Sequence, residues 1–174
     1  MAKIKKRIDG YHATEPRRAD EIINSGQFRD SHRDDEWLGT GVYFFYYPKH
    51  AQEWGRDHVR SALPQILRAE LTYTDEQMLN LDDPAVFDEF EATIEAMNSY
   101  ADVLKAARSL DWREQRRRLC YSCNLIREAW PEIGIISHTF SMQMSDITAF
   151  RRNQRQLCVS DHSIITHIEK AEVT

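Results

Sequence analysis

Two closely spaced glycines, Gly39 and Gly41, precede an aromatic run in the stretch WLGTGVYFFYYPKHAQEW, which spans residues 37–54. A buried strand needs aromatic side chains such as that of Tyr43, but it does not need two glycines immediately before it. Glycine adopts backbone dihedrals that other residues avoid, so it lets the chain pass close to a ligand. A helix that contains Trp54 is predicted to follow. The rings of Tyr43 and Trp54 suit a flat, cationic ligand.

Two further stretches carry polar groups of the kind that bind and position a substrate. GYHAT, at residues 10–14, ends a predicted strand with His12, and NQRQLCVSD, at residues 153–161, contains Gln156. In order and spacing, the three stretches resemble the ADP-ribosyltransferases of the diphtheria-toxin and poly(ADP-ribose) polymerase branch. That branch carries a His-Tyr-Glu triad on three separate strands. The resemblance covers about residues 8–82 and 133–172.

The resemblance implies a mono-ADP-ribosyltransferase that takes NAD as co-substrate, needs no metal and releases nicotinamide. It implies a catalytic triad of His12, Tyr43 and Gln156, in which glutamine replaces the usual glutamate. Gln156 can accept the same hydrogen bond, but it has no charge and cannot act as a base. The implied NAD-binding residues, with the nicotinamide held between the rings of Tyr43 and Trp54, are His12, Ala13, Thr14, Gly41, Tyr43 and Trp54.

The resemblance also places the loop before the third strand against the acceptor, and here that loop reads DITAFRRNQRQ, residues 146–156. A basic loop with an aromatic residue can hold phosphates and stack a base. The acceptor is therefore expected to be nucleic acid, either RNA or DNA, or a protein. The expected acceptor-binding residues are Phe150, Arg151, Arg152, Gln154 and Arg155. A small transferase of this type is similar to a bacterial or phage-related toxin, which an antitoxin or another partner would neutralise.

Two other classes of function stay open at this point. The first is a catalytically inactive module that binds NAD or ADP-ribose, because the glutamate of the triad is missing. The second is a partner-binding protein whose helical segment, at about residues 84–130, contacts another chain. A purely structural interpretation also stays open, in which His12 is a strand-end histidine, Tyr43 and Trp54 are core residues, and Gln156 is a surface strand residue.

Composition excludes some alternatives. The 174 residues suggest one domain, and no apolar run approaches the roughly 20 residues that a membrane span requires. We read no signal peptide, so a cytoplasmic protein is expected. The net charge of −5 means that any nucleic-acid site must be a local basic patch. Cys120 and Cys123 form a C-x-x-C without two further zinc ligands in a recognisable pattern. They are expected to lie on a helix from which one or both pack inward.

The elements that must position these residues follow from periodicity and from turn residues. They make an α+β fold, with an ADP-ribosyltransferase-like split mixed or antiparallel sheet, flanking helices and a helical insertion at about residues 84–130 in a single domain, residues 1–174. Helices are expected at 16–26, 48–63 and within 83–130. Strands are expected at 7–14, 41–47, 65–74 (completed by 78–83), 134–140, 155–161 and 163–173, with a loop at 141–154.

Overall fold

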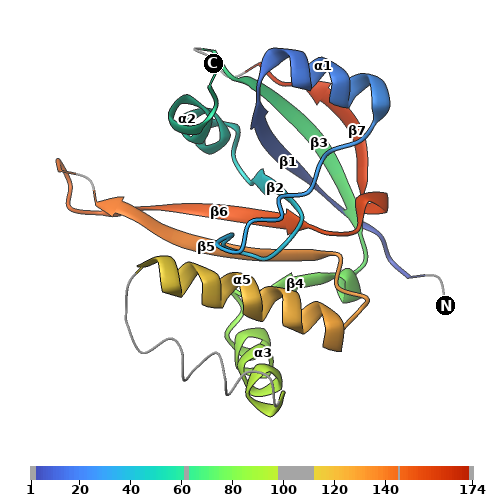
Figure 1. The fold of residues 1–174 in the computed structure, drawn as a ribbon, viewed down its shortest axis with the longest axis vertical. Coiled ribbons are helices and arrows are strands. Elements are labelled where there is room, and N and C mark those ends of the chain that lie inside the picture. The colour runs from blue at the N-terminus through green and yellow to red at the C-terminus, as the bar shows by residue number, and fades with distance from the viewer. Residues whose placement is uncertain (1–2, 61–62, 98–111, 145, 173–174) are drawn as a thin grey trace.

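The computed structural model describes residues 3–60, 63–97, 112–144 and 146–172 (Figure 1). Seven strands form one mixed sheet in the order β4-β5-β6-β2-β1-β3-β7. The strands are β1 (Lys6–Thr14), β2 (Val42–Phe45), β3 (Gln65–Tyr73), β4 (Met78–Asn80), β5 (Ile135–Met144), β6 (Arg151–Val159) and β7 (Ile165–Lys170). The helices described are α1 (Pro16–Ser25), α2 (Pro48–His58), α3 (Pro84–Ala96) and α5 (Trp112–Ala129). The predicted α+β class is confirmed.

The sheet narrows to a single residue pair at its centre. β1 pairs with β3 continuously from Lys6 to Thr14, whereas β1 and β2 pair only at Tyr11 and Phe45. Figure 1 shows the consequence, because β5 and β6 run in a clearly different direction from β1 and β3. The two halves of the sheet therefore diverge on either side of this junction.

Local sequence explains where the helices begin and end. Pro16 occupies the first turn of α1, and Gly26 ends that helix in the left-handed conformation (φ 68°). Ala19 and Ile22 are buried, as their spacing predicts. The side chain of Asp83 accepts a hydrogen bond from the backbone N–H of Ala85 at 2.9 Å and caps α3.

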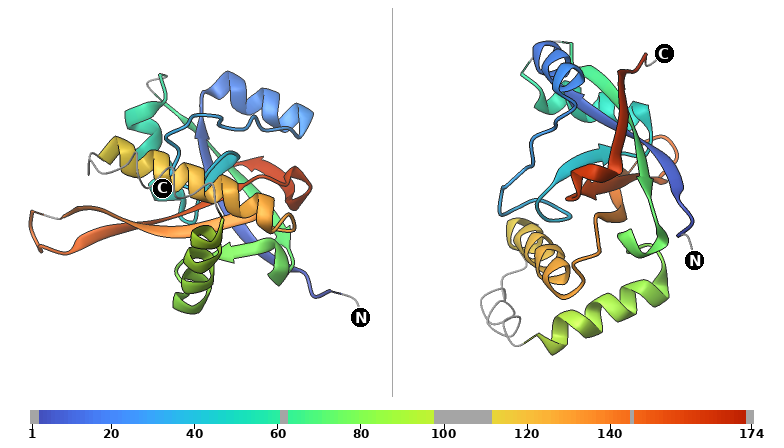
Figure 2. Two further views of the ribbon diagram at one scale, coloured as in Figure 1. Left: turned by 60° about the horizontal axis from the view of Figure 1, so that its bottom comes forward. Right: turned by 90° about the vertical axis from the view of Figure 1, so that its right-hand side faces the viewer.

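The two faces of the sheet are covered by different helices. We call them the α1 face, which carries Val42, Phe44 and Leu157, and the α5 face, which carries Tyr43 and Cys158. On the α1 face these side chains pack with Ala19 and Ile22 of α1 and with Phe28. α3 and α5 lie next to each other (Figure 2) and bury Phe90, Ile94, Cys123 and Ile126 against the α5 face, and Cys120 is also buried. α2 covers the other end of the α5 face, where Ala51 packs with Ala13, Phe45 and Ile66.

Four expectations about the elements are wrong in detail. Residues 78–80 do not complete β3, because β4 lies at the opposite edge of the sheet and runs parallel to β5. Most of the expected loop at 141–154 belongs to β5 and β6, whose outer parts, residues 139–144 and 146–155, form a long two-stranded arm. α2 ends at His58, since Val59 is extended, and β2 spans only four residues. The part of the predicted helical insertion at 98–111 lies outside the described residues.

Candidate functional site

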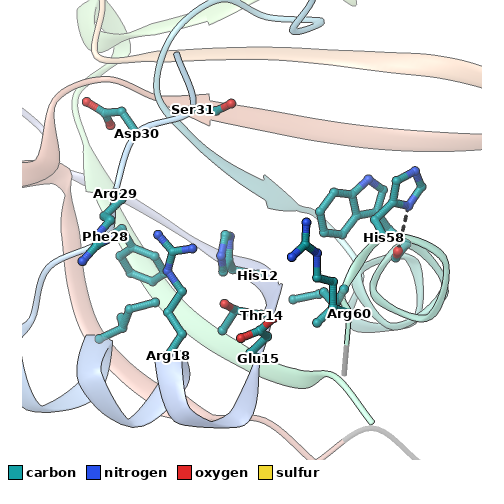
Figure 3. A pocket seen from close by; sticks show the side chains of 14 residues that line it. His12, Thr14, Glu15, Arg18, Phe28, Arg29, Asp30, Ser31, His58 and Arg60 are labelled. Atoms are coloured by element: carbon teal, nitrogen blue, oxygen red, sulfur yellow. Dashed lines mark hydrogen bonds between the residues drawn. The ribbon is translucent and has the colours of Figure 1, made fainter. Parts of the chain in front are cut away.

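A pocket of about 490 Å³ lies at the end of β1, between α1 and the end of α2 (Figure 3). β1 contributes His12–Thr14, followed by Glu15, and α1 contributes Arg18 and Ile22. The loop after α1 contributes residues 28–31, and the last turn of α2 contributes Trp54 and His58, followed by Val59 and Arg60. The structure therefore brings together four of the predicted NAD-binding residues, namely His12, Ala13, Thr14 and Trp54.

His12 is held in one orientation by the α1 face. Its ring makes edge contacts with Phe28 and Phe44, at centroid distances of 5.2 and 5.9 Å. Its Nδ1 lies 2.9 Å from the backbone oxygen of Tyr43. A carbonyl oxygen can only accept, so Nδ1 carries the proton and Nε2 is left as an acceptor for a ligand hydroxyl. Burial lowers the pKa of His12. The Tyr43 carbonyl opposes this effect and Arg18 adds to it, so the pKa stays below its ordinary value and the neutral ring is favoured.

Trp54 lies at the rim of the pocket. The residue is 39% exposed, and its ring stacks on His58, with centroids 4.7 Å apart and an interplanar angle of 8°. Trp54 does not point into the core, because Ala51 and Gly55 occupy the buried positions of α2. The stacked pair instead presents an aromatic surface that a flat ligand can contact.

Three arginines that no sequence motif singled out surround the pocket. Figure 3 shows Arg18 and Arg60 on either side of His12, with Arg29 further along the rim. Within the described residues, none of the three guanidinium groups makes a hydrogen bond or an ion pair. Of the two lining carboxylates, Asp30 lies 2.7 Å from His162 and is already paired. The pocket therefore favours an anionic ligand.

Tyr43 points away from this pocket. Successive side chains of a strand alternate between faces, so Tyr43 lies on the α5 face while His12 packs against Phe44 on the α1 face. The Tyr43 hydroxyl donates to the backbone oxygen of Gly39 (2.6 Å) and accepts from the N–H of Leu38 (2.9 Å). Burial raises the pKa of Tyr43 above its ordinary value. In this structure Tyr43 does not form the predicted sandwich with Trp54.

The two glycines also serve a different purpose from the one expected. Gly39 has φ 83°, and a Cβ there would lie 2.5 Å from Oδ1 of Asn124 on α5. A Cβ on Gly41 would lie 2.6 Å from the backbone oxygen of Val159. The N–H of Thr40, between them, donates to Asn124 at 2.8 Å. The glycines thus let the chain approach α5 and β6, and neither Gly39 nor Gly41 lines the pocket.

Gln156 and the predicted acceptor residues lie on β6 and the arm. Gln156 is half-buried and pairs with Phe45, so it shares the α5 face with Tyr43 and not the face of His12. His12, Tyr43 and Gln156 therefore lie on three neighbouring strands, but their side chains do not meet at one point. Arg155 is held at the base of the arm by Ser137 (2.9 Å) and Asn80 (3.3 Å). By contrast, Phe150, Arg151 and Arg152 are exposed.

We predict that Tyr43→Phe lowers the free energy of unfolding by about 1–3 kcal/mol and leaves NAD affinity unchanged. The loss arises because the buried partners of the hydroxyl at Leu38 and Gly39 would go unsatisfied. Urea denaturation measures the first quantity and calorimetric titration the second. Tyr121→Phe is the matched control, since Tyr121 is half-buried without a described hydroxyl partner. A stable Tyr43→Phe protein that fails to bind NAD would contradict this structural role.

Comparison with known proteins does not show which family the chain belongs to. No family model matches it, and no solved structure matches it. A stretch of 48 residues is 38% identical to "Uncharacterized protein MJ0359" of Methanocaldococcus jannaschii. That match covers 28% of this chain and 22% of the archaeal protein. Within the described residues, no group of three or more His, Cys, Asp or Glu side chains could hold a metal ion, and no helix is both long and apolar enough to cross a membrane.

Proposed function

We propose that the protein is a mono-ADP-ribosyltransferase that binds NAD in the pocket at the end of β1. The observation that carries the proposal is the meeting of His12–Thr14 with Trp54 in one cavity, although these stretches lie 40 residues apart. They are two of the three stretches on which the resemblance to ADP-ribosyltransferases depends. The cavity volume of about 490 Å³ falls within the usual range for small-molecule sites.

The chemistry of the lining matches the parts of NAD. The diphosphate carries two negative charges and would bind beside Arg18, Arg29 and Arg60. The cationic nicotinamide ring would stack on Trp54, with a contribution of about 0.5–2 kcal/mol. Nε2 of His12 would accept a hydrogen bond from a ribose hydroxyl. These contacts would hold NAD compact, so that most of the rate enhancement comes from positioning.

In the proposed reaction, the bond between the ribose carbon and the nicotinamide nitrogen breaks. Nicotinamide leaves with the bonding electron pair as a neutral molecule, and the ribose becomes oxocarbenium-like. An acceptor oxygen or nitrogen in nucleic acid or protein then forms the new bond and releases its proton. Because Gln156 is uncharged and cannot take that proton, the acceptor must be a good nucleophile or lose its proton to water. Because of this limit, we expect transfer of one ADP-ribose group without elongation. The proposal includes a role for the protein as the toxin of a toxin–antitoxin or phage-defence system.

A second candidate is a catalytically inactive module that binds NAD or ADP-ribose. Its supporting observation is the orientation of the triad, because the hydroxyl of Tyr43 is committed to the backbone and Gln156 lies on the opposite face from His12. The two candidates share the pocket and differ only in turnover. Release of nicotinamide from NAD, followed by chromatography, separates them.

Calorimetric titration with NAD tests the proposed pocket directly. We expect Trp54→Ala to weaken NAD binding by about 1–3 kcal/mol, the scale of a lost aromatic platform. Trp54→Phe, which keeps an aromatic ring at the same position, should retain most of the affinity. Equal affinities for the wild type and Trp54→Ala would remove the stacking role of Trp54. Wild-type protein that neither binds NAD nor releases nicotinamide would end the proposal.

A further inference from the structure

The arm formed by β5 and β6, of which the structure describes residues 139–144 and 146–155, extends beyond the rest of the sheet. β4 pairs with β5 only as far as Ser137, and β2 pairs with β6 only as far as Gln156. From Phe140 and Gln154 outward, the two strands pair only with each other within the described residues. Figure 1 shows the arm projecting away from the body of the molecule. A two-stranded ribbon with both edges open gains little stability by itself, so its length points to a surface that contacts a partner.

The tip of the arm is both apolar and basic. Ile147 is 94% exposed and Phe150 is 77% exposed. Arg151 and Arg152 follow directly and are also exposed, and Arg152 forms a loose ion pair with Glu53 at 3.6 Å. Residues 146–155 contain three arginines and one aspartate, in a chain whose net charge is −5. The arm is therefore a local positive region on an acidic protein, which suits an anionic partner.

A second exposed aromatic residue lies at the base of the arm. The N–H of Tyr46 donates to the backbone oxygen of Arg155 at 3.1 Å, and the guanidinium of Arg155 lies 5.2 Å from the centroid of the Tyr46 ring. These contacts fix the β2–α2 corner against the arm. The next residue, Tyr47, is 55% exposed, with its ring centroid 5.1 Å from that of Tyr46. No sequence motif pointed to Tyr47.

We infer that the arm and Tyr47 hold single-stranded nucleic acid, which serves as the acceptor of ADP-ribose; the acceptor role rests on the proposed function. Arg151 and Arg152 contact phosphates, while Phe150 and Tyr47 stack on bases. Base stacking on side chains requires unstacked bases, so a single strand uses the aromatic residues and a duplex does not. A protein partner would need an acidic surface and would leave the paired arrangement of exposed rings and arginines unexplained.

Fluorescence anisotropy with a labelled 20-nucleotide single strand, measured without NAD, tests the surface alone. We expect Arg151→Glu with Arg152→Glu to weaken binding at least about 30-fold and to reduce the salt dependence, since each lost phosphate contact removes about 0.7 from the logarithmic slope. Phe150→Ala with Tyr47→Ala should weaken binding about 10-fold or more at unchanged salt slope. Arg7→Glu with Arg17→Glu is the control, because it makes the same charge change at exposed, ion-paired arginines outside the arm.

The outcomes separate the two proposals. Loss of oligonucleotide binding in both arm variants, with the control and the NAD affinity unchanged, supports the inference. Equal binding by the arm variants and the control, or tighter binding of a duplex than of a single strand, overturns it. Incorporation of labelled ADP-ribose into protein alone also overturns it and leaves the transferase proposal standing. Conversely, if the protein binds the oligonucleotide through the arm but does not bind NAD, the nucleic-acid-binding surface is supported and the transferase proposal is refuted.

Discussion

Replacing both Arg18 and Arg60 by glutamate should raise the dissociation constant for NAD at least about 100-fold. Arg18 and Arg60 lie on either side of His12 in the pocket, and neither is neutralised by a carboxylate within the described residues (Figure 3). A charge pair at about 4 Å is worth roughly 1 kcal/mol in water and more beside a protein surface, and each substitution turns attraction into repulsion. Two reversals therefore cost about 3 kcal/mol, which corresponds to about two decades in affinity.

The matched control for this experiment is Arg17→Glu with Arg56→Glu. Arg17 precedes Arg18 on α1, and Arg56 lies on α2, four residues before Arg60. Neither Arg17 nor Arg56 lines the pocket. The control changes the net charge by the same amount, so it reports the effect of the general field. Calorimetric titration at two salt concentrations measures both variants. If the control loses as much affinity as the pocket variant, the diphosphate does not bind between Arg18 and Arg60.

His12→Ala should lower the rate of nicotinamide release about 100-fold, because the ribose would lose the group that positions it. The wild-type rate should also fall with acid. Protonation of His12 turns Nε2 from an acceptor into a donor, and burial lowers the pKa of His12 below its ordinary value of 6.5. The rate should therefore hold from pH 8 down to about 6.5 and decline only below that range.

A pH–rate profile of nicotinamide release, with His32→Ala as a control, checks this role. His32 is exposed and does not line the pocket. We expect the control to keep both the rate and the acid limb of the profile, and His12→Ala to lose both. An acid limb that persists unchanged in His12→Ala would assign it to another group. A wild-type rate of zero with intact NAD binding would favour the inactive module.

Local sequence determined most of the elements and their boundaries. Pro16 and Gly26 mark the ends of α1, Asp83 caps α3, and the alternation of apolar and polar residues identifies β3. Each of these signals depends only on residues close by in the sequence. The pocket residues His12–Thr14 and Trp54 were also predicted, since their spacing resembles that of a known family. The predicted boundaries were less accurate where strand pairing decides them. β5 and β6 are the example, because their extension into an arm depends on contacts between the two strands.

Which side chains meet was decided only by the tertiary structure. The face on which His12, Tyr43 and Gln156 lie depends on strand pairing, and a shift of one residue in β2 would exchange its two faces. The Gly-x-Gly signal was ambiguous, because close approach to Asn124 and Val159 requires glycine as much as close approach to a ligand does. Arg18, Arg29 and Arg60 come from a helix, a loop and the segment that follows another helix. Nothing in their local sequence links them, and they share a pocket because α1, the loop after it and the segment after α2 all lie around the end of β1.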